Sequence, residues 1–344
     1  MPRLTTVRDL PFELLERILD LAAGECDLDD RAGLSSRTSF LRGAALVAHC
    51  FCAPAQSCLW RKVRVHSSDT AKKWLGSKCH RAYPATELSL EGVHAGSDGL
   101  SGATASRVLR QVVGVRTLKL MDFGRLSLRV LQNDNLSTLE TLYLMSSFPD
   151  KSATVTTLAF PFHLRTLHLF NRNYSSDLLP TLFGQCASTL TSLTLITSPS
   201  SPSYASLVRA FPAVAPSLVH LSLQHRPAPA LVAEFATCTR LERLECSFAV
   251  DLAAVLDALP TPSRLAHLSV ELDYNLVDVA HTLVARLDRD DALGRLDRLT
   301  FPRAPARTEF RQFGGDDLLA RCRDRGITLE LGEVVAWRTR SVFE

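Results

Sequence analysis

Apolar residues along most of this 344-residue chain recur in one short pattern: leucine, two residues, leucine, one residue, leucine. Regular copies are Leu139-Leu142-Leu144, Leu164-Leu167-Leu169, Leu190-Leu193-Leu195 and Leu218-Leu221-Leu223; relaxed copies are Val115-Leu118-Leu120, Leu241-Leu244-Cys246, Leu265-Leu268-Val270 and Leu296-Leu299-Phe301. Successive copies are displaced by 23 to 31 residues, the period of a unit with one strand and one helix. The pattern therefore predicts a stack of similar units, which presents an extended binding surface.

Each copy has the alternation of a strand, with Leu118 and Leu120 on the buried face and Lys119 and Met121 on the other. Between the strands, apolar residues at helical spacing predict helices over residues 103–113, 177–186, 204–211, 231–237, 252–259 and 276–287. Two further strands, Glu87–Leu90 and Ile327–Leu331, extend the array. We therefore expect an α/β fold of about eight to ten repeats, a curved parallel sheet with outer helices.

These units resemble leucine-rich repeats, whose stacked strands form a horseshoe. Many such repeats carry asparagine or cysteine three residues after the last leucine. Here those positions hold Arg172, Ser198, Arg226 and Ala304. The departure predicts an irregular solenoid over residues 66–344.

Residues 1–65 do not repeat and have a helical pattern instead. Pro11 suits the first turn of a helix, and Gly24 suits its end. The apolar face between them comprises Leu14, Leu15, Ile18, Leu19 and Ala22. A second helix is expected over Thr38–Phe51 and a third from Pro54, followed by an extended segment from Arg61 to Val65.

Three stretches in this segment resemble an F-box: Leu10-Pro11-x-Glu13-Leu14-Leu15-x-x-Ile18-Leu19, Ala48-His49-x-Phe51 and Leu59-Trp60-Arg61-x-Val63. The resemblance covers roughly residues 8–65. In that family the segment is a small helical module that docks on the Skp-type adaptor of a cullin-RING ubiquitin ligase. Members with C-terminal leucine-rich repeats use the repeats to hold the substrate, which matches the order found here. The loop before the second helix is longer than the minimal family pattern.

The resemblance implies an adaptor interface to which six residues contribute: Leu10, Pro11, Leu14, Ile18, Leu46 and Trp60. A three-helix module also needs a core of its own, so some of these side chains pack internally in the alternative interpretation. The division between core and contact stays open at this stage.

The positions beside the repeat leucines predict where a target protein would bind. Four adjacent strands present the row Met121, Met145, Phe170 and Ile196, which is flanked by Tyr143 and His168. Methionine adapts to varied surfaces and aromatic residues anchor interfaces. Beyond this row the same face becomes polar, through Gln224, Arg243, Glu245 and Glu271. The alternative interpretation is that a loop, or the tail around Trp337 and Phe343, covers the row.

Composition narrows the class of partner. The net charge of +3 and the lack of dense Lys/Arg runs argue against nucleic acid and membrane partners.

No stretch resembles a signal peptide or a membrane span. The nine cysteines are scattered and suit reduced thiols, so we expect a cytoplasmic or nuclear protein without a bound metal. Catalytic motifs such as G-x-S-x-G, a phosphate loop or H-E-x-x-H are missing from the sequence, which predicts no enzyme activity and no cofactor.

The sequence as a whole therefore predicts a non-catalytic substrate receptor of an SCF-type ubiquitin ligase. In this hypothesis the F-box-like module binds the Skp-type adaptor, and the repeats bind the target protein. The alternative is a leucine-rich-repeat interaction scaffold unrelated to ubiquitination, in which the helical segment caps the repeats.

Overall fold

The computed structural model describes residues 10–28, 30–77, 79–93, 99–148, 159–272, 276–289, 292–304 and 310–334. The chain divides into two compact units, Met1–Leu164 and Arg165–Glu344. Both units combine parallel strands with helices, so the expected α/β class is confirmed.

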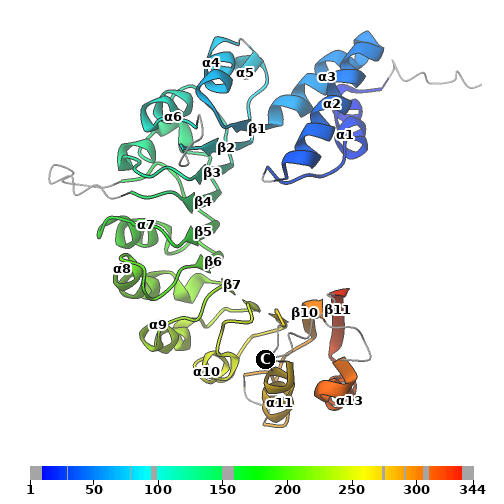
Figure 1. The fold of residues 1–344 in the computed structure, drawn as a ribbon, viewed down its shortest axis with the longest axis vertical. Helices are drawn as coiled ribbons and strands as arrows, with labels where there is room; N and C mark the ends of the chain where they lie inside the picture. Colours follow the sequence, from blue (N-terminus) through cyan, green and yellow to red (C-terminus); the bar gives the residue numbers. More distant parts are fainter. Residues whose placement is uncertain are drawn as a thin grey trace, which may run out of the picture. The chain divides into compact units, whose positions relative to one another are not determined.

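Unit 1 begins with three helices and continues as alternating strands and helices (Figure 1). Its helices are α1 (Phe12–Ala22), α2 (Arg31–Val47), α3 (His49–Arg61), α4 (Ser68–Gly76), α5 (Cys79–Ala82) and α6 (Gly102–Leu109), with 3-10 turns η2 (Leu128–Val130) and η3 (Asp134–Leu136). The strands described in this unit are β1 (Lys62–Val65), β2 (Glu87–Glu91), β3 (Thr117–Met121) and β4 (Thr141–Met145), and they pair in parallel in that order.

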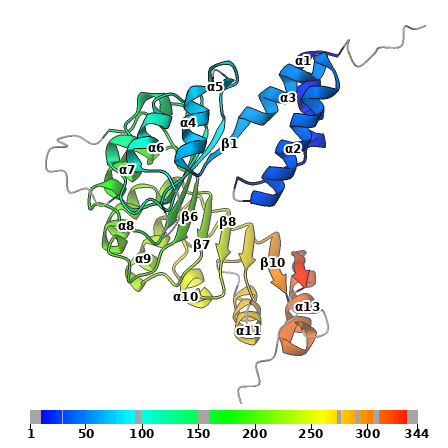
Figure 2. The ribbon, with the colours of Figure 1, turned by 45° about the horizontal axis from the view of Figure 1, so that its top comes forward.

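Unit 2 continues the alternation. Its strands are β5 (Thr166–Phe170), β6 (Ser192–Ile196), β7 (His220–Leu223), β8 (Arg243–Cys246), β9 (His267–Val270), β10 (Arg298–Ala304) and β11 (Thr328–Val334). Its α-helices are α7 (Leu178–Cys186), α8 (Tyr204–Ala210), α9 (Pro229–Ala233), α10 (Leu252–Asp257), α11 (Leu276–Leu287) and α13 (Asp316–Asp324). Its shorter turns are η4 (Phe211–Ala213), η5 (Ala215–Ser217), η6 (Glu234–Thr237) and the π-helical turn η7 (Arg311–Gly315). The seven strands described in this unit also pair in parallel in sequence order, and Figure 2 shows α7, α8 and α9 on one side of β6–β8.

The leucines of the repeat pattern form the cores of both units. Leu118 lies beside Leu142 and Leu120 beside Leu144 in the strand register, and all four are fully buried. Each strand places its leucines at the same two register positions, so the leucines of neighbouring strands form apolar rows. The helices pack against these rows. The predicted stack of strand–helix units is confirmed in each unit.

Serine hydroxyl groups bridge neighbouring strand–helix units. The hydroxyl of Ser146 donates to the Leu120 carbonyl at 2.9 Å and accepts the Phe123 N–H at 3.1 Å. Ser247 donates to the Gln224 carbonyl at 2.8 Å. These bonds satisfy backbone N–H and C=O groups at or just beyond the ends of the strands.

The helices of the N-terminal module differ from the sequence expectation. α2 begins at Arg31, seven residues before Thr38, because the Asp30 carboxylate accepts the Gly33 N–H at 2.9 Å and caps the helix. It ends at Val47, since Ala48 is extended with φ −153° and ψ 149°. The expected continuous helix to Phe51 and a third helix starting at Pro54 are therefore wrong: α3 starts at His49 and contains Pro54.

Most helices expected between the repeat strands lie where the apolar spacing placed them. Residues 177–186, 204–211 and 252–259 form α7, α8 and α10 within a few residues of the expected ends. The segment expected at 231–237 instead divides into α9 and the 3-10 turn η6, and the helix expected over 103–113 ends at Leu109.

Candidate protein-interaction surfaces

One side of α1 is apolar and open to solvent. Leu14, Ile18 and Leu21 follow one another at helical spacing and are 48%, 49% and 70% exposed. On the other side, Leu15 and Leu19 are 4% and 5% exposed. The apolar face expected for this helix is therefore split, and only part of it packs inside the protein.

The C-terminal half of α2 carries a second open stripe. Phe40, Leu46 and Val47 are exposed, with Leu46 reaching 88%. Of the twelve large hydrophobic side chains exposed in the described part of the chain, seven lie in α1 and α2. We call these seven the α1/α2 apolar side chains: Phe12, Leu14, Ile18, Leu21, Phe40, Leu46 and Val47. Exposed apolar side chains that follow one another along a helix, as Leu14, Ile18 and Leu21 do, are typical of interaction sites.

The six residues predicted for the adaptor interface divide between exposed and partly buried positions. The exposed ones are Pro11, Leu14, Ile18 and Leu46. Leu10 is partly buried, and so is Trp60, whose indole N–H donates to the Gln56 side chain at 3.2 Å. The spacing Leu14-Ile18-Leu21 could have indicated Leu21 as well. Phe40 and Val47 are exposed as well and were not among the predicted interface residues.

The core of the module is small. Leu19, Leu41, Ala55 and Cys58 form it, one or two from each of α1, α2 and α3. Burial is the main reason that the pKa of Cys58 rises to about 11, which suits a thiol that acts as a small apolar group. Because this core is so limited, polar contacts carry much of the packing between the three helices.

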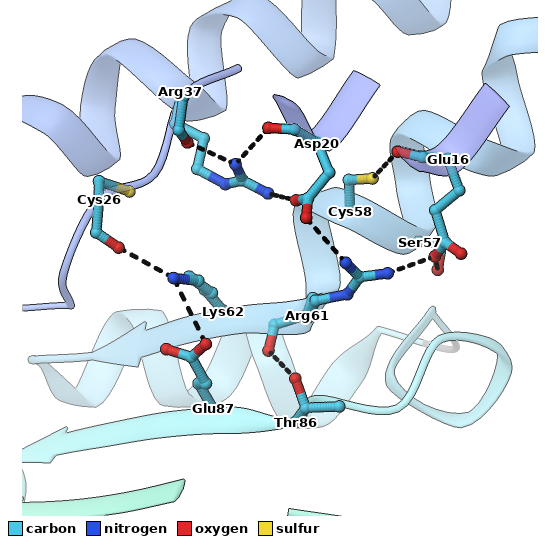
Figure 3. A network of polar contacts seen from close by, with 11 residues as sticks. Glu16, Asp20, Cys26, Arg37, Ser57, Cys58, Arg61, Lys62, Thr86 and Glu87 are labelled. Atoms are coloured by element: carbon cyan, nitrogen blue, oxygen red, sulfur yellow. Dashed lines mark hydrogen bonds and ion pairs between the residues drawn. The ribbon is translucent and has the colours of Figure 1, made fainter. Parts of the chain in front are cut away.

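Two arginines join the helices through a polar network (Figure 3). Arg37 of α2, 3% exposed, binds the Asp20 carboxylate and donates to the Gly24 carbonyl at 2.8 Å. Arg61 of α3 binds Asp20 at 3.0 Å and Glu16 at 2.7 Å. The network thus fixes α1 against both other helices.

The loop between α1 and α2 attaches the module to the sheet of unit 1. Lys62 of β1 donates to the Cys26 carbonyl at 3.0 Å, as Figure 3 also shows, and Arg64 donates to the Leu28 carbonyl at 3.3 Å. Leu28 itself is fully buried. The loop between α1 and α2 therefore has a structural use: it contacts the face of β1 opposite the buried Val63 and Val65.

Met121 and Met145 are side by side on that face in unit 1, paired in the register of β3 and β4. Both are partly buried, and the Ser89 hydroxyl approaches the Met121 sulfur at 3.4 Å. Beside them the Lys119 ammonium lies 4.5 Å from the ring centre of Tyr143, a cation–π contact. These side chains form a partly accessible apolar edge.

Phe170 and Ile196 form the equivalent pair in unit 2, in the register of β5 and β6. Both are partly buried, as is His168, which lies beside Thr194. The hydroxyl of Tyr174 donates to the Phe170 carbonyl at 2.8 Å, which holds the end of β5. The two pairs belong to different units, and the tail around Trp337 and Phe343 lies outside the described residues.

The same face of the sheet becomes polar further along unit 2. The Ser192 hydroxyl lies 3.1 Å from Nδ1 of His220, and Nε2 of that histidine lies 3.3 Å from Glu245, an ion-pair distance without good hydrogen-bond alignment. Arg243 binds the same carboxylate at 2.6 Å. The contact with His220 is the largest reason that the pKa of Glu245 falls to about 2. These contacts hold the Glu245 carboxylate between His220 and Arg243 on this face.

Neither the protein-family models nor the curated proteins match this chain. Within the described residues, histidine, cysteine and carboxylate side chains form no group of three that could hold a metal ion. None of the described helices is both long enough and apolar enough to span a bilayer.

Proposed function

We propose that this protein is a non-catalytic substrate receptor of an SCF-type cullin-RING ubiquitin ligase. In this proposal α1–α3 dock on the Skp-type adaptor, and the repeats bind a target protein. The observation that carries the proposal is the exposure of Leu14 and Ile18 beside buried Leu15 and Leu19 in the segment that resembles an F-box. An apolar stripe left open on a helix suits a partner that covers it.

The attachment of the module to the sheet supports the same role. Lys62 and Arg64 bind the carbonyls of Cys26 and Leu28, so the α1–α2 loop and the sheet of unit 1 are directly linked. A receptor acts by holding its target near the transfer machinery, which raises the effective concentration without chemistry of its own. A flexible connection would lower this effective concentration, so direct bonds between the docking module and the sheet of unit 1 support the role.

In this proposal each unit supplies an apolar edge of its own for the target protein: the partly buried pair Met121–Met145 in unit 1 and the pair Phe170–Ile196 in unit 2. Tyr143 lies beside the first pair and His168 beside the second, and each adds a polar group next to the apolar side chains. This combination suits a peptide segment with apolar side chains. The proposal places the protein in the cytosol or nucleus, where the ubiquitin ligases of this class work.

Affinity purification of the full-length protein from cells tests the proposal. We expect the Skp-type adaptor and the cullin to co-purify with the wild type, and Leu14→Ala/Ile18→Ala to lose both. Leu10→Ala/Pro11→Ala should weaken the same complex. The matched control is Arg17→Ala, which changes an exposed polar residue of the same helix.

Recombinant adaptor mixed with the purified variants gives a second readout that does not depend on the cell. Equal adaptor binding by the wild type and by Leu14→Ala/Ile18→Ala would overturn the proposed interface. If the wild type brings down neither adaptor nor cullin, the chain is instead an interaction scaffold unrelated to ubiquitination.

A further inference from the structure

A basic cavity of about 470 Å³ lies between α2 and β1 in unit 1. Successive turns of α2 supply Arg31, Ser35, the adjacent pair Thr38 and Ser39, and Arg42, all on one face of the helix. Arg64 of β1 and His66 just after it form the opposite wall. The cavity has the size of a small-molecule site.

Positive charge dominates this cavity. Its described lining includes three arginines and a histidine but no carboxylate. Glu91, which is not part of the lining, binds Arg31 at 3.0 Å and Arg64 at 2.7 Å. Although burial alone would raise the pKa of Glu91, the hydrogen bond from Arg64 and the nearby positive charges lower it below its ordinary value. This single carboxylate thus pairs with two of the three arginines that line the cavity.

The cations differ in how firmly they are held. The Arg64 side chain is 10% exposed and also donates to the Leu28 carbonyl, so its position is fixed before any ligand arrives. Arg31 is 76% exposed. Within the described residues, the side chains of Arg42 and His66 have no hydrogen-bond or ion-pair partner. The cavity therefore combines one pre-positioned cation with others whose donors are available.

We propose that this cavity binds a phosphate monoester. Guanidinium groups match phosphate oxygens with paired N–H donors, and the hydroxyls of Ser35 and Ser39 add neutral donors on the same wall. The shared chemistry is a dianionic phosphate on a small organic group, either a free metabolite or a phosphorylated serine or threonine of a peptide. The site contains none of the α1/α2 apolar side chains, so its failure would leave the adaptor proposal untouched.

Isothermal titration calorimetry of the full-length protein tests this site with defined probes. The probes are O-phospho-L-serine, a phosphoserine peptide, its unphosphorylated copy, and phosphatidylcholine vesicles with and without phosphatidylinositol phosphate. We expect saturable binding of the phosphorylated soluble probes that weakens as salt is added. Arg42→Glu should weaken it by about tenfold or more, because a charge-assisted bond is lost and a repulsive charge is added.

Further variants separate the roles of charge and hydroxyl groups. Ser35→Ala/Ser39→Ala should weaken binding a few-fold while keeping the charge, and Arg42→Lys should restore part of the affinity that Arg42→Glu loses. Arg209→Glu, an exposed arginine of α8, is the matched control and should bind as the wild type does. Circular dichroism checks that each variant is folded.

The probes also decide the source of the phosphate. Equal affinity for phosphoserine and the phosphopeptide would indicate a free metabolite, whereas tighter binding of the peptide would indicate a phosphorylated protein segment; both support the site. Three results would overturn it: no binding of soluble phosphorylated probes, unchanged binding in Arg42→Glu, or binding to phosphoinositide vesicles alone.

Discussion

The ammonium group of Lys119 lies 2.5 Å from the Asp27 carboxylate, although 92 residues separate the two in the chain. Lys119 belongs to β3 and its side chain is only 3% exposed, while Asp27 lies in the loop between α1 and α2. A buried ammonium is costly unless it is paired. The ion pair therefore helps to hold the helical module on the sheet of unit 1.

Replacing Asp27 by alanine should loosen this attachment. The variant leaves Lys119 buried without one of its partners, and we expect a loss of about 1–2 kcal/mol, less than for a fully buried pair because Asp27 is 64% exposed. Thermal unfolding should show a lower midpoint, and hydrogen exchange should become faster in the loop of residues 24–30.

The double variant Asp27→Ala/Lys119→Met distinguishes loss of the pair from general damage to the loop. Methionine removes the buried charge at similar length, so it should restore much of the lost stability. Asp69→Ala, which breaks an exposed pair with Lys72, should change the midpoint little. An Asp27→Ala protein as stable as the wild type would contradict this role.

Alanine substitutions of the adjacent residues Leu14 and Leu15 in α1 should have different effects: the first should reduce adaptor binding and the second should reduce stability. Leu15→Ala removes a side chain that is 4% exposed, and we expect a loss of about 2–4 kcal/mol. Leu14→Ala alters a side chain that is 48% exposed and should cost about 0.5 kcal/mol or less. Denaturant unfolding of the two variants measures this difference.

The same pair of variants provides a control on the proposed adaptor interface. If the α1/α2 apolar side chains bind the adaptor, Leu14→Ala should reduce its binding without loss of stability. Should Leu14→Ala destabilise the protein as much as Leu15→Ala does, the exposed stripe would instead belong to the core.

Arg37 should not be replaceable by lysine. Its guanidinium binds the Asp20 carboxylate and donates to the carbonyls of Asp20 and Gly24 at 3.3 and 2.8 Å. One ammonium cannot reproduce this planar set of donors, so Arg37→Lys should cost about 1–3 kcal/mol. Arg42→Lys, an exposed position of the same helix, should have almost no effect on stability. Equal thermal midpoints for the two variants would argue against the network.

Leucine spacing was sufficient to predict strands β3 to β10, because a period of two within each copy and a regular displacement between copies define which residues stack. The sequence prediction missed the start of α2, because Gly33 and Ser35 are weak helix formers. The segment is helical because Asp30 caps it and Arg37 binds Asp20 of α1. Tertiary contacts of this kind have no signature in the spacing of apolar residues.

The candidate surfaces show the same limit. Alternation correctly placed Lys119 on the face opposite the leucines, but it could not show that a loop from the start of the chain buries this side chain. Nor could it separate Leu14 from Leu15, since both are apolar and only the packing around α1 decides which one is covered. Sequence therefore located the surfaces, and packing determined how much of each is open.

Glu245 should make the stability of unit 2 depend on pH. Its pKa falls from the ordinary value of 4.5 to about 2, first because of the contact with His220 and further because of Arg243. A carboxyl group whose pKa is lower in the folded state binds a proton more readily in the unfolded state. Its contribution to stability is therefore complete above about pH 5 and is lost as the pH falls towards 2.

The variant Glu245→Gln keeps the shape of the side chain and removes this titration. Above about pH 5 we expect the wild type to be more stable by about 1–2 kcal/mol, a value reduced for the partial exposure of the pair. The difference should shrink steadily as the pH falls, because the protonated carboxyl of the wild type then resembles the amide. Thermal midpoints from circular dichroism at a series of pH values measure this trend.

The matched control is Glu242→Gln, an exposed position just before β8, which should give a small difference in stability at every pH. A Glu245→Gln difference that does not change with pH would rule out the ion pair as its origin.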